Sequence, residues 1–123
     1  MRRQPRPERE FAERLTRRGL FGVKSEEAPL DARDVVRGWL HDLGSGRDQQ
    51  VFVHRSWGTL AAVPDRGQPV SVLMTDGGDP TWFAVPPGAG DDTDLTPEQI
   101  EWIMLDALTS SGPPDWPQWR PLF

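Results

Sequence analysis

Apolar residues in the first part of the chain recur with a helical spacing. Residues 7–19 place Phe11 and Leu15 four positions apart on one helical face, and Gly19 then offers a natural end. The apolar face is thin, so the helix is either an ordered arm or one that frays. The pattern therefore predicts a short helix near the N-terminus.

A wider apolar stripe follows over residues 31–44. Asp31 is a candidate N-cap, Asp34 favours the first turn, and Gly44 is a candidate stop. These signals predict a second helix. Its apolar stripe consists of Val35, Val36, Trp39, Leu40 and Leu43.

The middle of the chain has the composition of short strands. Residues 50–56, 58–64, 70–75 and 81–86 are rich in β-branched and aromatic side chains, and Gly, Pro and Asp separate them. Since the connections are short, successive strands should pair antiparallel in a meander of about four strands.

The clearest helix signal lies in the last third of the chain. Thr96 is a candidate cap, Pro97 suits the first helical position, and Gln99 completes a capping box. Residues 115–123 cannot continue as a helix because prolines interrupt them, so this tail should be extended and lie against the body. The apolar stripe of the third helix consists of Ile100, Ile103, Met104, Ala107 and Leu108.

Together these elements predict one α+β domain in which helices cover one face of the sheet, with the order α-α-β-β-β-β-α. Residues 1–24 are predicted to form a basic helical arm that is either ordered or flexible. Residues 25–123 then form a single domain with an extended tail rich in Trp and Pro.

Charge is unevenly distributed over the 123 residues. The net charge is −5, yet residues 1–24 hold eight basic against three acidic residues, and residues 65–106 hold nine acids and one base. An acidic body repels nucleic acid and attracts a basic protein. The chain has no cysteine, no long apolar run and no secretory leader, so we expect a cytoplasmic protein that does not bind a membrane.

The sequence offers little catalytic chemistry. His41 is expected at the surface of its helix, and His54 is expected either to point outward from the sheet or to pair with a carboxylate. Ser56 lies two residues after His54, a spacing too common to indicate a catalytic pair. Neither histidine has the spacing of a metal motif. We therefore expect no enzymatic activity, no cofactor and no metal.

Acidic and indole side chains gather in the second half of the chain. The acids are either a solvating loop or a surface for a partner. Trp82 is expected in the core or on the sheet surface, and Trp102 lies off the apolar stripe where the tail could dock. Trp116 and Trp119 either pin the tail to the domain or form exposed anchors. The predicted partner-binding residues are Asp76, Asp79, Asp91, Asp92, Asp94, Trp82, Trp102, Trp116 and Trp119.

The C-terminal half resembles a known family, the actinobacterial immunity proteins of polymorphic toxin systems that are often encoded beside deaminase-type toxins. The resemblance covers roughly residues 28–119. It rests on a strand that ends in an aromatic residue, a proline-glycine turn, a capped helix, a G-x-P motif and a closing tryptophan. In this chain these are Phe83, Pro87, Gly88, residues 96–108, Gly112, Pro114, and Trp116 or Trp119.

The resemblance implies a cytoplasmic protein that binds a co-encoded toxin and covers its active site. The partner would be a basic, nucleic-acid-targeting toxin domain, and the chain itself a monomer or weak homodimer. Two alternatives stay open. One is a non-catalytic adaptor or chaperone for a secreted partner that binds through the tail or a sheet edge. The other is a small enzyme or ligand-binding domain that uses His54 and nearby carboxylates.

Overall fold

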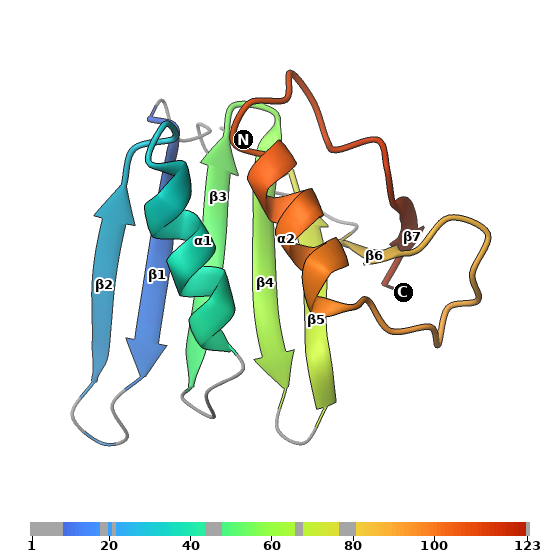
Figure 1. Ribbon diagram of the computed structural model, residues 1–123, viewed down its shortest axis with the longest axis horizontal. Coiled ribbons are helices and arrows are strands. Elements are labelled where there is room, and N and C mark those ends of the chain that lie inside the picture. Colours follow the sequence, from blue (N-terminus) through green and yellow to red (C-terminus); the bar gives the residue numbers. More distant parts are fainter. Residues whose placement is uncertain are drawn as a thin grey trace, which may run out of the picture.

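The described residues form one seven-stranded antiparallel sheet and two helices in a computed structural model (Figure 1). The structure describes residues 9–17, 20, 22–43, 48–65, 68–76 and 81–122. The strand order across the sheet is β2-β1-β3-β4-β5-β6-β7. The strands are β1 (Phe11–Arg17), β2 (Val23–Ala28), β3 (Gln49–Arg55), β4 (Gly58–Asp65), β5 (Gln68–Thr75), β6 (Trp82–Val85) and β7 (Gln118–Pro121), and the helices are α1 (Arg33–Asp42) and α2 (Pro97–Asp106).

Both helices lie on the same face of the sheet (Figure 1). Alternate residues of the central strands point toward them, so that Val53 of β3 stands opposite Leu60 of β4, and Val51 stands opposite Ala62. These side chains have no exposed surface. Ile103 and Met104 of α2 and Val36 and Trp39 of α1 complete the core between helices and sheet.

The four predicted middle strands and the third predicted helix are found at the expected places. The capping box of α2 is confirmed: the Thr96 hydroxyl accepts from the Gln99 amide, and the Gln99 side chain accepts from the Thr96 amide. Helix α1 is also found, but the predicted cap is wrong. Ala32 occupies the N-cap without a side-chain hydrogen bond. Val35, predicted in the apolar stripe, is 47% exposed.

The predicted fold class is wrong. The chain is mostly β, with order β-β-α-β-β-β-β-α-β, rather than a four-stranded meander with two to three helices in the order α-α-β-β-β-β-α. Within the predicted helix at residues 7–19, Phe11–Arg17 form strand β1, which pairs with both β2 and β3. It is therefore part of the sheet rather than a helical arm. Residues 1–8, 18, 19 and 21 lie outside the described part of the chain.

Strand pairing explains why β1 is not a helix. Alternation puts Ala12 and Arg14 on the side of the helices, where Ala12 is fully buried and the Arg14 guanidinium lies 5.5 Å from the Trp39 ring centre. Glu13 points to the other face and bonds His54. These tertiary contacts outweigh the helix propensity of Ala, Glu, Arg and Leu.

The tail is extended and lies against the body, as predicted. Residues Gln118–Pro121 form β7, which pairs antiparallel with β6 so that Trp119 stands opposite Ala84. The other edge of the sheet is β2, whose exposed residues are largely polar and charged, a composition that discourages pairing with other chains.

Candidate partner-binding face

Two tryptophans meet on the outer side of α2. Trp102 projects from the helix and is 61% exposed, and Trp116 in the following segment is 36% exposed. Their rings lie edge to face, with centres 5.9 Å apart and an angle of 84°. This is a favourable geometry for two aromatic quadrupoles. The predicted meeting of Trp102 with the tail is confirmed.

Carboxylates flank both tryptophans along the chain. Glu98 and Asp106 lie four residues before and after Trp102, and so occupy the same stripe of α2. Asp115 directly precedes Trp116, and all three acids are exposed. We call Trp102, Trp116, Glu98, Asp106 and Asp115 the indole face.

The acids of α2 differ in how their charge is balanced. Glu101, on the side toward α1, accepts from Arg37 at 2.9 Å and lies 3.4 Å from His41. No described cation forms an ion pair with Glu98, Asp106 or Asp115. The indole face therefore carries negative charge that the described part of the fold leaves uncompensated.

Three side chains fix the segment that follows α2. Arg55 donates to the carbonyl of Ala107, the Trp57 indole donates to the carbonyl of Ser110 at 3.3 Å, and the Trp119 indole donates to the carbonyl of Pro114 at 3.0 Å. The end of a helix leaves carbonyls without intrahelical donors, and Arg55 satisfies one of them. We call Arg55, Trp57 and Trp119 the clasp, because together they hold the segment that carries Trp116.

The clasp is supported by Glu10, the residue that directly precedes β1. The Glu10 carboxylate accepts from Arg55 at 2.9 Å and from the Ser56 amide at 2.8 Å. The hydrogen bond from the Ser56 backbone, followed by that from the Arg55 side chain, lowers the pKa of Glu10 below its ordinary value. Glu10 therefore stays ionised and orients Arg55 toward α2.

The predicted acidic loop lies elsewhere. It connects β6 to α2 and projects beyond β7, away from the C-terminal half of α2 (Figure 1). Asp91 pairs with Arg120 at 3.1 Å, and Arg120 also donates to the carbonyl of Ala89. Asp91 is thus used to hold its own loop, whereas Asp92 and Asp94 are exposed.

The remaining predicted site residues are dispersed. Asp76 is exposed at the end of β5, and Asp79 lies outside the described residues. Trp82 is half-buried in β6, opposite Pro121 of β7. Trp119 packs against the core and serves as a clasp. Of the nine predicted residues, the structure brings Trp102 and Trp116 into contact. The prediction missed Glu98, Asp106 and Asp115, although their spacing from the two tryptophans was a usable signal.

His54 pairs with a carboxylate, one of the two expected roles. On the face of the sheet opposite the helices, its Nε2 lies 2.9 Å from Glu13 and its Nδ1 lies 3.2 Å from the Thr59 hydroxyl. Its ring stacks on Phe52 and lies against Phe11. Since both ring nitrogens hold cross-strand hydrogen bonds, the side chain links β1, β3 and β4.

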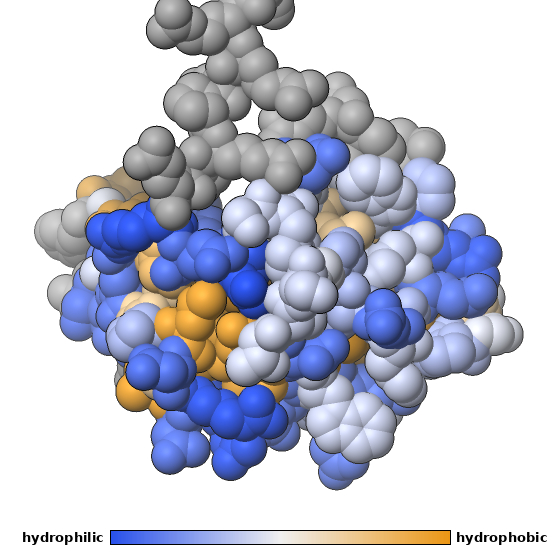
Figure 2. Space-filling model, turned by 90° about the horizontal axis from the view of Figure 1, so that it is seen from above, coloured by the Kyte–Doolittle hydropathy of each residue, from blue (hydrophilic) through white to orange (hydrophobic). Residues whose placement is uncertain are grey.

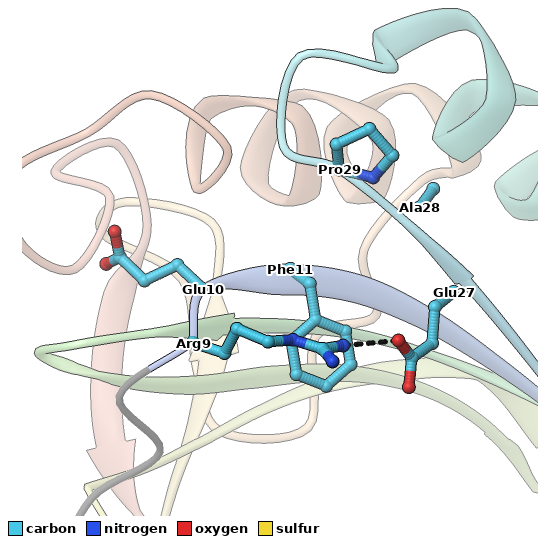
Figure 3. A pocket seen from close by; sticks show the side chains of 6 residues that line it. All are labelled: Arg9, Glu10, Phe11, Glu27, Ala28 and Pro29. Atoms are coloured by element: carbon cyan, nitrogen blue, oxygen red, sulfur yellow. Dashed lines mark hydrogen bonds and ion pairs between the residues drawn. The ribbon is translucent and has the colours of Figure 1, made fainter.

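An open depression of about 290 Å³ lies where β1 begins and β2 ends. Figure 3 shows Arg9 crossing it to pair with Glu27, while the guanidinium covers the Phe11 ring. Glu10 points away toward Arg55. The charged groups that line it are thus already engaged, Arg9 with Glu27 and Glu10 with Arg55.

The end of the sheet where α2 terminates is seen in Figure 2. Its surface is largely hydrophilic, and the most extensive of its hydrophobic areas is drawn in orange. No group of three or more His, Asp or Glu side chains in the described part of the chain is arranged to hold a metal ion. Neither helix among the described residues has the length and hydrophobicity needed to cross a bilayer.

Comparison with protein-family models, with curated proteins and with solved structures finds no significant match to this chain.

Proposed function

We propose that this protein is a cytoplasmic immunity protein that neutralises a co-encoded toxin by binding it and covering its active site. The exposed, edge-to-face pair of Trp102 and Trp116 carries this proposal. Tryptophan is enriched at interface hot spots because it buries a large area while few rotatable bonds are frozen.

The surroundings of the pair support binding. Exposed Trp102 does not help the core, and Asp106 lies at the C-terminal end of α2, where a negative charge opposes the helix dipole. An exposed tryptophan and a negative charge at a helix C-terminus are both unfavourable for an isolated domain. Here they occur on one stripe of α2. Such local conflicts are expected where a surface serves recognition.

The negative charge suits a basic partner. A toxin that acts on nucleic acid presents a positive groove, and an acidic inhibitor imitates the phosphates and associates quickly through electrostatic steering. Association should therefore slow as salt rises, because counterions screen charges over about 8 Å at physiological ionic strength. The resemblance in the C-terminal half points to the same class of partner.

The clasp supports the affinity of such a surface. Arg55, Trp57 and Trp119 fix the backbone that leads from α2 to Trp116 before any partner arrives. A preorganised contact loses less conformational entropy on binding than a flexible one.

The test is rescue by co-expression. The toxin-like domain encoded nearest this protein is expressed in a sensitive host with the wild type, with the double variant Trp102→Ala/Trp116→Ala, or with Val35→Ala. Val35 is an exposed apolar residue on α1 and serves as the control. We expect rescue and co-purification with the wild type and Val35→Ala, and loss of both with the double variant.

Two results would contradict the proposal. If the neighbouring domain is harmless when expressed alone, there is no toxin to neutralise. If the two proteins co-purify without rescue, an adaptor role is favoured. Deleting the tail is unsuitable as a test, because the deletion would remove β7 and Trp119 from the fold.

A further inference from the structure

We infer that the indole face recognises an arginine side chain of the partner, which stacks on Trp102 while Glu98 and Asp106 hold its guanidinium. This inference rests on the proposed function, since it names the chemistry that the partner offers to the same face. It also moves the electrostatic contact from the predicted loop acids to the acids of α2.

The geometry of Trp102 carries the first step. Trp116 meets it edge to face, with ring planes at 84°. The Trp102 side chain is nevertheless 61% exposed, so much of its indole surface stays available. A cation above an indole face is attracted by the ring quadrupole, and tryptophan is the strongest aromatic partner for this contact.

The two acids provide the second step. Glu98 and Asp106 lie one helical turn on either side of Trp102, and side chains at this spacing are surface neighbours. A guanidinium is planar, stacks on aromatic rings and donates several hydrogen bonds in its own plane, which an ammonium does not. A stacked arginine can therefore reach the acids that flank the ring.

The same chain shows this combination of contacts with its own arginine. Arg14 lies 5.5 Å from the Trp39 ring centre while it bonds Glu26 at 2.8 Å and Asp42 at 3.3 Å. There, the indole and the carboxylates come from two elements, α1 and β2, and the arginine is supplied by β1 of the same chain. On the indole face the indole and the carboxylates are present, and no described arginine pairs with them.

The loop acids fit this role less well. Asp91 is engaged by Arg120. Asp92 and Asp94 are exposed on a loop whose remaining contacts, from Arg120 and Gln118, hold its backbone. Since neither lies on the helical stripe of Trp102, they add long-range attraction without contacting a side chain stacked on that ring.

The experiment titrates the purified full chain with a short peptide of alternating arginine and glycine and follows tryptophan fluorescence. A second peptide replaces each arginine with citrulline, which keeps the planar shape without the charge. The variants are Trp102→Ala, Glu98→Gln/Asp106→Asn and the matched control Asp92→Asn/Asp94→Asn. The two double variants remove equal charge. Circular dichroism verifies the fold of each.

We expect the arginine peptide to bind the wild type, and the citrulline peptide to bind at least about tenfold more weakly. Trp102→Ala should weaken arginine-peptide binding by about tenfold, and Glu98→Gln/Asp106→Asn by about fivefold. The loop control should stay within about twofold of the wild type, because its acids act only through screened, long-range attraction.

Three results would overturn the inference: equal binding of both peptides, unchanged binding by Trp102→Ala, or an equal loss in the two double variants. The last would mean nonspecific attraction to an acidic protein. Failure here and failure of the proposed function are distinguishable. Rescue from the toxin with no arginine selectivity would reject only the arginine site, and arginine selectivity with no rescue would reject only the immunity role.

Discussion

Two pairs of tryptophans act on the same stretch of chain in opposite ways. Trp57 and Trp119 are half-buried, and each donates its indole N–H to a backbone carbonyl of the segment after α2. Trp102 and Trp116 are exposed and contact each other instead. The first pair fixes the position of the segment, and the second uses that position to present aromatic surface. A tryptophan's role is therefore decided by where its N–H and its ring faces point, which composition does not reveal.

Trp119→Ala should have the largest effect, because it removes one of the two tryptophans that fix the segment after α2. We expect the free energy of unfolding to fall by about 3 kcal/mol, the order of magnitude for removing a large core side chain, because Trp119 packs against the core and bonds the Pro114 carbonyl. Urea denaturation followed by circular dichroism measures it. Trp119→Phe should cost about 1 kcal/mol for the lost hydrogen bond plus a smaller packing loss. If Trp119→Ala lowered the free energy of unfolding by less than Trp119→Phe does, the Trp119 ring would pack only loosely against the core.

Arg55→Met should lower the free energy of unfolding by about 2 kcal/mol, since it leaves the Ala107 carbonyl without its charged donor. Methionine keeps much of the aliphatic length, so the loss reports mainly on the hydrogen bonds. Chemical denaturation at neutral pH gives the value. Arg37→Met on the outer side of α1 removes an exposed pair with Glu101 and should cost below about 1 kcal/mol. Equal losses would contradict a special role for the clasp.

These two predictions concern residues whose roles could not be predicted from the sequence. Arg55 lies near the end of a predicted strand, and nothing in its neighbours indicates that it reaches a helix end encoded 52 positions later. Helix α2 was predictable because its cap, its Pro97 and its apolar stripe are all local signals. A contact between a strand end and a distant carbonyl depends on the register of the sheet, which no local signal specifies.

The helix wrongly predicted at β1 and the absence of β2 from the predicted strands have the same origin. β1 is rich in helix-forming residues, and β2 has the polar composition of a connector. Both become strands because β3 offers an unpaired edge, to which β1 and then β2 add. Trp102 was placed correctly at the tail because its departure from the apolar stripe is itself a local signal. The loop acids were grouped with it only through proximity in sequence.

Glu10→Gln should change how the stability of the protein depends on pH, because Glu10 supports the clasp through Arg55. The pKa of Glu10 is lowered in the folded protein by the Ser56 amide and the Arg55 side chain. Its contribution to stability is therefore complete above the ordinary glutamate pKa, about 4.3, and is lost as pH falls through the lowered folded value. We expect the wild type to lose stability over this acid range more steeply than the variant. Thermal unfolding between pH 7 and pH 3 measures both. Parallel curves would show that Glu10 does not contribute through its charge.

Trp102→Ala should have the smallest effect on the free energy of unfolding and a clear effect on how far small solutes reach the exposed indoles. Because Trp102 is 61% exposed, we expect the free energy of unfolding to change by about 0.5 kcal/mol or less, while quenching of tryptophan emission by small solutes falls. Because the flanking acids are negative, caesium should quench the wild type more efficiently than iodide does when each ion is scaled to its quenching of free tryptophan. Glu98→Gln/Asp106→Asn should narrow that difference between the two ions. Asp92→Asn/Asp94→Asn should leave it nearly unchanged. If Asp92→Asn/Asp94→Asn narrows the difference between caesium and iodide quenching as much as Glu98→Gln/Asp106→Asn does, the exposed indoles experience the charge of the whole protein rather than that of α2. The two tryptophan pairs would then differ in burial alone.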